Sequence, residues 1–143
     1  MADKRTLRVY TEEEAAERLA RELPTWYVER GWIRRRYRTY SWKGTLMVIN
    51  AVGHLAEAAW HHPDITASYA WVEVRLKTHD HQGITDKDFA LAKKIEEVIM
   101  WRPEPPLEGT PEKDLRFAYI RYDRPKEAPG GEAGGEGEGG GPA

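Results

Sequence analysis

The sequence of 143 residues contains no cysteine. Disulfides, thiolate nucleophiles and cysteine-ligated zinc or iron–sulfur centres are therefore excluded, and a reducing compartment is compatible with the chain. No apolar run approaches the ~20 residues that cross a bilayer, and the first residues lack the apolar stretch of a signal peptide. We therefore expect a soluble, cytoplasmic protein without membrane contact.

A basic excess is also missing. Residues 125–143 hold four of the 24 acidic and one of the 22 basic side chains, so 21 Lys and Arg remain against 20 Asp and Glu. This balance lacks the footprint of a nucleic-acid binder, and we expect no such partner. The local exception is the run Arg34-Arg35-Arg36 with Arg38. Strand alternation divides these residues between two faces, so we interpret them as solvated charges or inter-subunit pairs rather than one basic stripe.

The length suits one domain. From Pro125 onward the chain is rich in Gly, Glu and Pro, and eight of its 13 glycines lie there. Such a composition cannot bury enough apolar surface to offset the entropy of ordering. We therefore expect a single domain over residues 1–124 and a disordered tail over residues 125–143.

Caps and helical spacing predict three helices. The first begins with a capping box at Thr11 and ends before Pro24. The second, over residues 43–60 after Ser41 as its N-cap, is apolar around most of its circumference, so we expect it to lie against a sheet and a second subunit. The third begins with a capping-box pattern formed by Thr85 and Asp88.

Strand patterns lie between and after these helices. Residues 26–29 and 32–40 are rich in aromatic and β-branched side chains and predict a hairpin around Gly31. Residues 69–77 alternate between apolar and polar and predict a half-buried strand. Residues 116–122 could add a C-terminal edge strand. The order favours an α+β fold in which helices pack on one face of an antiparallel sheet.

All five histidines lie between positions 54 and 81. Four of them fall in two polar strings, Glu57-Ala-Ala-Trp60-His61-His62-Pro63-Asp64 and Thr78-His79-Asp80-His81-Gln82-Gly83. Because imidazole exchanges protons near neutral pH, the strings favour proton-transfer chemistry or a metal site. We interpret His54, within the central helix, as structural and His81 as an exposed loop residue.

The spacing places the strings where a site could form. Glu57 and His61 are four residues apart and share a face if the helix extends as far as His61, while His79 follows a strand. A helix end and a strand end can meet at a cleft, where Asp80 and Asp88 could orient imidazole rings. Imidazoles and carboxylates also suit zinc or iron, but no ligand pattern such as His-Glu-x-x-His is present. We therefore expect no metal.

Together the two strings resemble the pterin-4a-carbinolamine dehydratase family, and the similarity covers residues 11–100. The resemblance implies a four-stranded antiparallel sheet with helices on one side, assembled into homodimers or homotetramers. It also implies dehydration of 4a-hydroxytetrahydropterin to quinonoid dihydropterin, which recycles the pterin used by aromatic amino acid hydroxylases. The pterin would be the substrate, and no cofactor is expected.

The resemblance also implies a set of site residues. Its catalytic histidines match His61, His62 and His79, and its helix glutamate matches Glu57. The threonine and the acidic residue that flank its third histidine match Thr78 and Asp80, and these three residues are expected to bind the substrate. Trp60 departs from the family, which commonly has Asn or Asp there. This position therefore either loses a polar contact to the substrate or gains a stacking surface for the flat pterin.

The reaction suits histidines, because it removes a hydroxyl from C4a and a proton from N5 without redox change. One neutral imidazole can take the N5 proton while an imidazolium protonates the hydroxyl, each contributing about 10²–10⁴-fold. We expect His61 and His79 to be this pair and His62 to bind and orient the pterin. Two alternatives stay open: a non-catalytic protein-binding or assembly module on the same fold, and a metal-dependent hydrolase.

Overall fold

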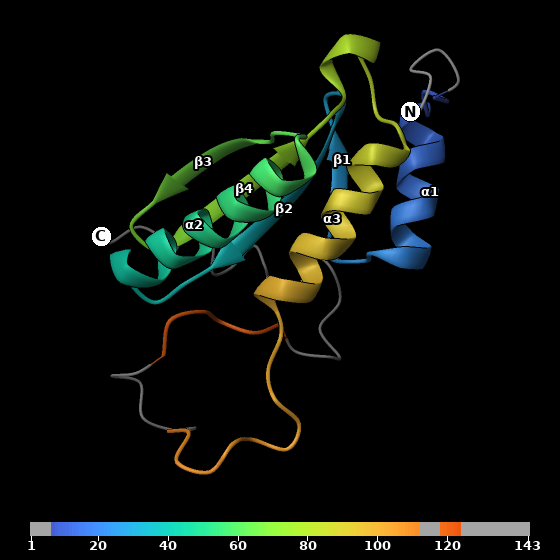
Figure 1. The fold of residues 1–143 in the computed structure, drawn as a ribbon. Helices are drawn as coiled ribbons and strands as arrows, with labels where there is room; N and C mark the ends of the chain where they lie inside the picture. Colours follow the sequence, from blue (N-terminus) through green and yellow to red (C-terminus); the bar gives the residue numbers. More distant parts are fainter. Residues whose placement is uncertain (1–6, 112–117, 124–143) are drawn as a thin grey trace.

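The computed structural model describes residues 7–111 and 118–123. Along the chain (Figure 1) the elements are α1 (Glu12–Glu22), β1 (Tyr27–Glu29), β2 (Trp32–Arg38), α2 (Trp42–Ala59), β3 (Asp64–Ser68), β4 (Trp71–Leu76), the short 3-10 helix η2 (His79–His81) and α3 (Asp86–Ile99). The tail predicted to be disordered lies outside the described residues. No helix in the described ranges is long and apolar enough to traverse a bilayer.

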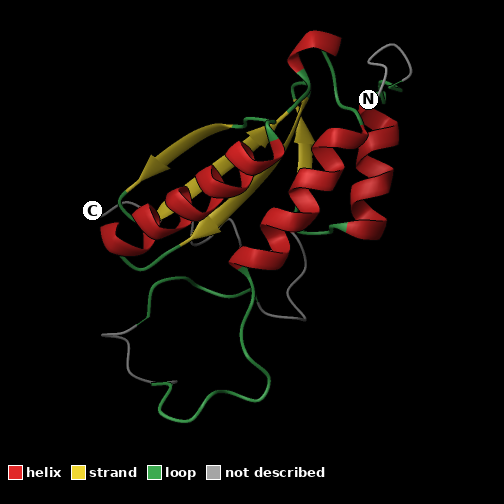
Figure 2. Ribbon diagram, in the orientation of Figure 1, coloured by secondary structure: helices red, strands yellow, loops and turns green. Residues whose placement is uncertain are grey.

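The four strands form one antiparallel sheet in the order β1-β2-β4-β3. The α-helices lie together on one side of this sheet (Figure 2), which confirms the predicted α+β class. Its register pairs Ile33 with Leu76 and Tyr37 with Val72, and these four side chains are fully buried. Alternation along β2 and β4 therefore supplies the floor of the core that the helices cover.

Both predicted capping boxes are present. Thr11 and Thr85 each accept a backbone N–H at the start of their helix, and the carboxylates three residues later return a contact to the cap backbone N–H. These reciprocal bonds fix where α1 and α3 begin. Ser41 occupies the N-cap of α2, but its side chain makes no capping hydrogen bond.

The fourth strand is β3, which the residue pattern did not predict. It pairs with β4 along its whole length, yet Ile65 is its only side chain that is not exposed, so no apolar alternation marks it. The predicted strand over residues 116–122 contributes less. Its described part forms one isolated bridge, between Ile120 and Thr39.

The arginine run lies on β2 and alternates between the two faces of the sheet. Arg34, Arg36 and Arg38 are two residues apart, so they share the sheet face away from the helices. Arg35 alone turns to the helix side, where it is 4% exposed and binds Glu96 at 2.8 Å. Strand alternation therefore divides the four residues between two faces, as predicted, but the interpretation as solvated charges is wrong for the buried Arg35.

Residues 118–123 pack against the open end of the sheet. Asp123 binds the buried Arg35 at 2.6 Å. The carbonyl oxygen of Tyr119 lies so close to Gly44, in the first turn of α2, that a Cβ there would collide with it. This part of the C-terminal extension is therefore an integral piece of the packed domain.

Candidate active site

The end of α2 turns the histidine pair toward α3. Trp60 adopts a left-handed conformation (φ 54°, ψ 47°) and caps the helix, while the backbone N–H of His61 donates to Ala56. The chain then reverses, and the ring of His61 turns inward with only 9% of the residue exposed. Its Nε2 lies 2.6 Å from Oδ1 of Asp88.

Asp88 is the centre of a buried polar cluster. It is fully buried in the first turn of α3, and its Oδ2 accepts hydrogen bonds of 2.9 Å from the hydroxyl of Thr78 and from the backbone N–H of Thr85. The two threonine hydroxyls lie 2.7 Å apart. One carboxylate thus joins His61, from the end of α2, to Thr78, from the end of β4.

The contacts of Asp88 also define which nitrogen of His61 is available. A carboxylate accepts hydrogen bonds, so Nε2 of His61 is the N–H donor in this pair. The other ring nitrogen, Nδ1, is then the one that can exchange a proton with a bound molecule. A buried acceptor of this kind fixes both the orientation and the tautomer of the imidazole.

His62 faces solvent beside Glu57 and Trp60. Its Nε2 lies 3.0 Å from Oε1 of Glu57, and both side chains are at least half exposed. The indole of Trp60 is 72% exposed and meets the imidazole edge-to-face, with ring centroids 4.9 Å apart. These three predicted residues therefore form one exposed polar and aromatic group next to the buried His61.

His79 begins η2, directly after Thr78, and is exposed. Its ring packs edge-to-face against Trp32, with centroids 5.8 Å apart. Within the described residues its imidazole makes no hydrogen bond to protein, so both nitrogens can face a ligand. Asp80 pairs with Nδ1 of His81 at 3.0 Å rather than with His79.

The structure therefore brings the two strings together only in part. His61 and Thr78 meet through Asp88, whereas His79 lies on the adjoining turn without a side-chain contact to His61 or His62 among the described residues. Two interpretations of histidines outside the predicted site were wrong. His54 is exposed on α2 rather than structural, and His81 is half-buried rather than an exposed loop residue.

An apolar groove of about 480 Å³ runs between α2 and α3. Leu55, Leu91 and several alanines form most of its lining, and His61 contributes to it, whereas His62 and His79 do not. Of the predicted site residues, the buried histidine is therefore the one that lines this groove.

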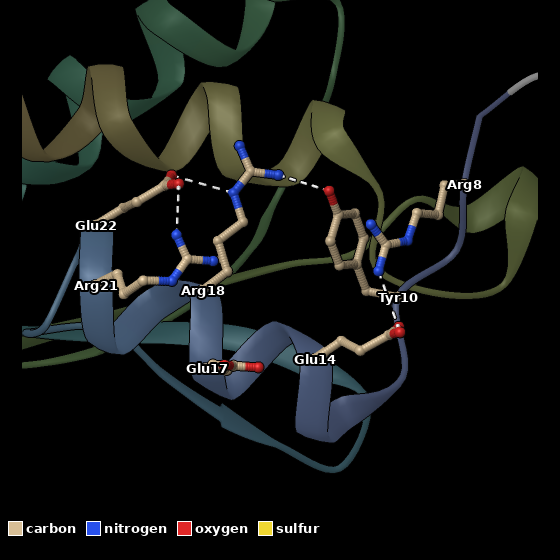
Figure 3. A pocket seen from close by; sticks show the side chains of 7 residues that line it. All are labelled: Arg8, Tyr10, Glu14, Glu17, Arg18, Arg21 and Glu22. Carbon is tan, nitrogen blue, oxygen red and sulfur yellow. Dashed lines mark hydrogen bonds and ion pairs between the residues drawn. The ribbon is translucent and has the colours of Figure 1, made fainter.

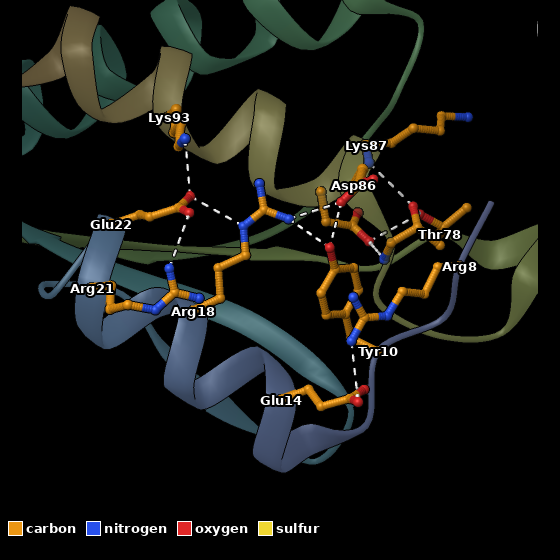
Figure 4. Close-up of polar contacts among 12 residues, drawn as sticks. Arg8, Tyr10, Glu14, Arg18, Arg21, Glu22, Thr78, Asp86, Lys87 and Lys93 are labelled. Atoms are coloured by element: carbon orange, nitrogen blue, oxygen red, sulfur yellow. Dashed lines mark hydrogen bonds and ion pairs between the residues drawn. The ribbon is translucent and has the colours of Figure 1, made fainter.

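A second hollow, polar and of about 410 Å³, lies along α1 (Figure 3). None of the predicted site residues lines it. Figure 4 shows that most of its charged side chains are paired with neighbouring residues: Arg18 and the hydroxyl of Tyr10 both donate to Asp86, at 2.8 and 2.6 Å. These bonds hold the pKa of Asp86 below its usual range, the Tyr10 hydroxyl contributing most and Arg18 next. Because Asp86 begins α3, the network fixes the helix end that carries Asp88.

The most perturbed ionisable cluster lies away from the histidines, where Glu96 meets Arg35. Burial alone would raise the pKa of Glu96. The hydrogen bonds and positive charge of Arg35, together with hydrogen bonds from Tyr37 and Trp26, outweigh burial, so the pKa of Glu96 is lowered. The guanidinium binds both carboxylate oxygens, at 2.8 and 2.9 Å. Its location between the sheet and α3 makes it a structural ion pair.

No three His, Asp or Glu side chains in the described ranges come together as a metal site.

Comparison with known proteins agrees with this fold and these strings. Residues 8–98 match the family model described as "Pterin 4 alpha carbinolamine dehydratase", and the chain belongs to this family. It is 42% identical over 87 residues to a protein of Aquifex aeolicus and 44% identical over 89 residues to one of Chloroflexus aurantiacus. Each is named "Putative pterin-4-alpha-carbinolamine dehydratase". The matches cover 61% and 62% of this chain and 88% and 95% of those proteins.

A solved structure has the same fold. The crystal structure of a transcriptional coactivator/pterin dehydratase from Brucella melitensis superposes with a TM-score of 0.58 at 26% identity. The match covers 64% of this chain and 99% of that chain. Residues 99–123, including the segment packed against Gly44, lie outside the range matched by the family model.

Sequence reasoning left Asp88 out of the set of site residues and missed Trp32. Asp88 was identified as a cap and a residue that could orient imidazole, but the same Thr-x-x-Asp pattern begins many helices, and only folding reveals His61 on its other oxygen. Trp32 was assigned to a strand, and its contact with His79 depends on the register between β2 and β4.

Proposed function

We propose that this protein dehydrates a 4a-hydroxytetrahydropterin to the quinonoid dihydropterin by histidine acid–base catalysis. Family membership supports the substrate class. The observation that supports the chemistry best is the bond from His61 to Asp88, because Asp88 also binds Thr78, the residue before His79. The two polar strings thereby share one buried anchor.

The reaction needs two coordinated proton movements. A neutral imidazole takes the proton from N5, the N5 electron pair forms the C4a=N5 double bond, and the C4a–O bond breaks. An imidazolium gives its proton to the departing hydroxyl, which leaves as water. Atoms and charge balance without an oxidant, and the two histidines end with their protonation states exchanged.

His61 and His79 are the proposed pair. His61 would act through Nδ1, because Nε2 is engaged by Asp88. His79 is exposed with both nitrogens available to a ligand. Each positioned proton transfer would contribute about 10²–10⁴-fold. His62, held by Glu57, would bind and orient the pterin, with Thr78 and Asp80 supporting the turn that carries His79.

Trp60 would contribute an aromatic surface for the flat pterin. Its indole is largely exposed and stands next to His62, so a ring that contacts His62 can also lie against it. Replacing Trp60 with alanine should raise KM and leave kcat nearly unchanged, because stacking stabilises the ground and transition states alike. An unchanged KM would assign Trp60 no part in binding.

Stopped-flow absorbance with chemically generated carbinolamine tests the proposed activity. The wild type should accelerate dehydration above the spontaneous rate, and the His61→Ala/His79→Ala double variant should lose the acceleration. His54→Ala, an exposed histidine elsewhere on α2, is the matched control and should retain full activity. A double variant as fast as the wild type would reject this assignment.

We propose in addition that the chain self-associates as a homodimer or homotetramer. Trp42, Leu46 and Met47 are large apolar side chains on α2, and each is more than 40% exposed. Covering them would bury apolar surface. Sedimentation velocity should therefore detect a mass above that of the monomer, and Leu46→Glu should shift the population toward monomer. A strictly monomeric wild type would contradict self-association.

A non-catalytic binding role is the second candidate, and the same exposed α2 surface favours it. The solved relative from Brucella melitensis is described as a coactivator as well as a pterin dehydratase. If binding alone were the function, the wild type would not accelerate dehydration. In the catalytic case, the carbinolamine would come from a hydroxylation that consumes tetrahydropterin, as in aromatic amino acid hydroxylases.

A further inference from the structure

The start of β2 carries an aromatic and cationic cluster beside His79, on the sheet face away from the helices. The indole of Trp32 is its centre. Besides its edge contact with His79, this ring has the ammonium of Lys77 4.7 Å and the guanidinium of Arg75 5.5 Å from its centroid. The β2–β4 register pairs Ile33 with Leu76, so the next positions, Trp32 and Lys77, adjoin on this face.

The two cations differ in how they are compensated. Arg75 has carboxylate partners, with Asp64 and Glu73 each 3.6 Å away. Lys77 makes no ion pair or hydrogen bond with any residue in the described ranges, and it is half-buried. Its contact is the Trp32 ring. Glu29 lies opposite Trp32 in the β1–β2 register, but it is exposed and does not pair with Lys77.

A half-buried ammonium that lies on an indole and has no carboxylate partner among the described residues is suited to bind an anion. The indole supplies an apolar ring, and the ammonium over that ring supplies the positive charge. The indole contacts His79, one of the two proposed acid–base residues, and Lys77 lies on the same indole. A substituent on a pterin ring held at His79 would therefore extend over Trp32 toward Lys77.

We infer that Trp32 and Lys77 receive the side chain of the pterin substrate, and that this side chain carries a negative charge as a phosphate or a carboxylate. This inference rests on the proposed dehydratase function, because it requires His79 to contact the pterin ring. In this arrangement Lys77 discriminates between anionic and neutral substrates, whereas the histidines carry out the proton transfers.

The test compares carbinolamines that share the pterin ring and carry a neutral, a carboxylate or a phosphate side chain. In stopped-flow assays Lys77→Gln should lower kcat/KM for the anionic substrates by about three- to tenfold, the range of a partly exposed ion pair. The neutral substrate should be unaffected. Lys77→Arg should restore the anionic rates, and rising salt should reduce the wild-type preference. The two anionic arms distinguish a phosphate site from a carboxylate site.

Arg36→Gln is the matched control. Arg36 also lies over a tryptophan on this face, 4.0 Å from the centroid of Trp71, but at the far end of β2 from His79. It should leave the discrimination between substrates unchanged. Glu29→Gln removes the acidic side chain opposite Trp32 and should raise kcat/KM for anionic substrates.

Failure of this inference and failure of the dehydratase proposal give different results. Equal wild-type rates on neutral and anionic substrates, with no response to Lys77→Gln, would overturn the anion subsite and leave the dehydratase intact. If no carbinolamine is accelerated, the dehydratase proposal fails. Calorimetric titration with the oxidised anionic and neutral pterins then decides the subsite: weaker binding of the anionic pterin alone to Lys77→Gln supports it, and equal binding refutes it.

Discussion

Replacing Asp88 with asparagine perturbs the proposed site at its buried anchor while preserving its shape. The amide oxygen can still accept from Thr85 and Thr78, as Oδ2 does now at 2.9 Å. The amide nitrogen would then replace Oδ1, which lies 2.6 Å from Nε2 of His61. Because an amide nitrogen donates, Nε2 would have to become an acceptor and the hydrogen would move to Nδ1.

Two magnitudes follow from this geometry. A hydrogen bond to a charged group contributes about 1.5–3 kcal/mol, so the free energy of unfolding should fall by about 2 kcal/mol. The tautomer change should have a larger effect on the rate of dehydration than on stability, because Nδ1 of His61 could no longer take a proton. Reversal of a histidine tautomer by the same Asp-to-Asn change lowers kcat by about 10⁴ in a serine protease triad. With His79 and substrate binding intact, we expect a loss of about 10²–10⁴-fold.

Urea unfolding and stopped-flow dehydration measure the two effects separately. The expected variant is folded, modestly destabilised and nearly inactive. The Asp64→Asn variant is the matched control, because Asp64 is exposed, pairs with Arg75 at 3.6 Å and should alter the rate far less. A folded Asp88→Asn protein with the wild-type rate would refute the role of Asp88 and, with it, the use of Nδ1 of His61.

Two further perturbations test the packing that holds the site. Glu96→Gln should lower the free energy of unfolding by about 3 kcal/mol at pH 7, because it leaves the buried Arg35 with an incomplete partner. The pKa of Glu96 is lowered in the folded state, so its stabilisation is present above its ordinary value of 4.5 and is lost as the pH falls through the folded value. Urea titrations between about pH 3 and 6 should therefore give a flatter pH dependence for Glu96→Gln, and parallel curves would contradict this. Gly44→Ala should lower the free energy of unfolding by about 1–3 kcal/mol, because the new Cβ would collide with the Tyr119 carbonyl. Gly53→Ala, whose Cβ meets nothing within 4 Å, should instead stabilise the helix by about 0.5–1 kcal/mol. Equal melting temperatures for the two variants would exclude the contact between Gly44 and Tyr119.

The helices could be predicted from sequence because their signals are local. Thr11 and Thr85 carry capping boxes whose partners lie three residues away, and helical periodicity continues from them without interruption. The β2–α2–β4 core could also be predicted, since its strands alternate or carry β-branched and aromatic side chains. The strand β3 could not, because an exposed edge strand is held by backbone pairing to β4 and needs no apolar pattern.

The candidate site could be predicted as a list of residues but not as a set of contacts. The strings place His61 and His79 at element ends, where polar side chains can converge. Nothing local indicates that His61 is buried on Asp88, 27 positions later, or that Trp32 packs on His79. Both contacts depend on how α3 docks and how β2 and β4 are registered, which are properties of the whole fold.

The most direct test is a crystal structure of the protein with a non-reactive oxidised pterin. The account predicts one pterin ring within hydrogen-bond distance of Nδ1 of His61 and of a ring nitrogen of His79, with His62 beside it. A pterin bound elsewhere, or one that reaches only one of these two histidines in every protomer of the assembly, would contradict the account.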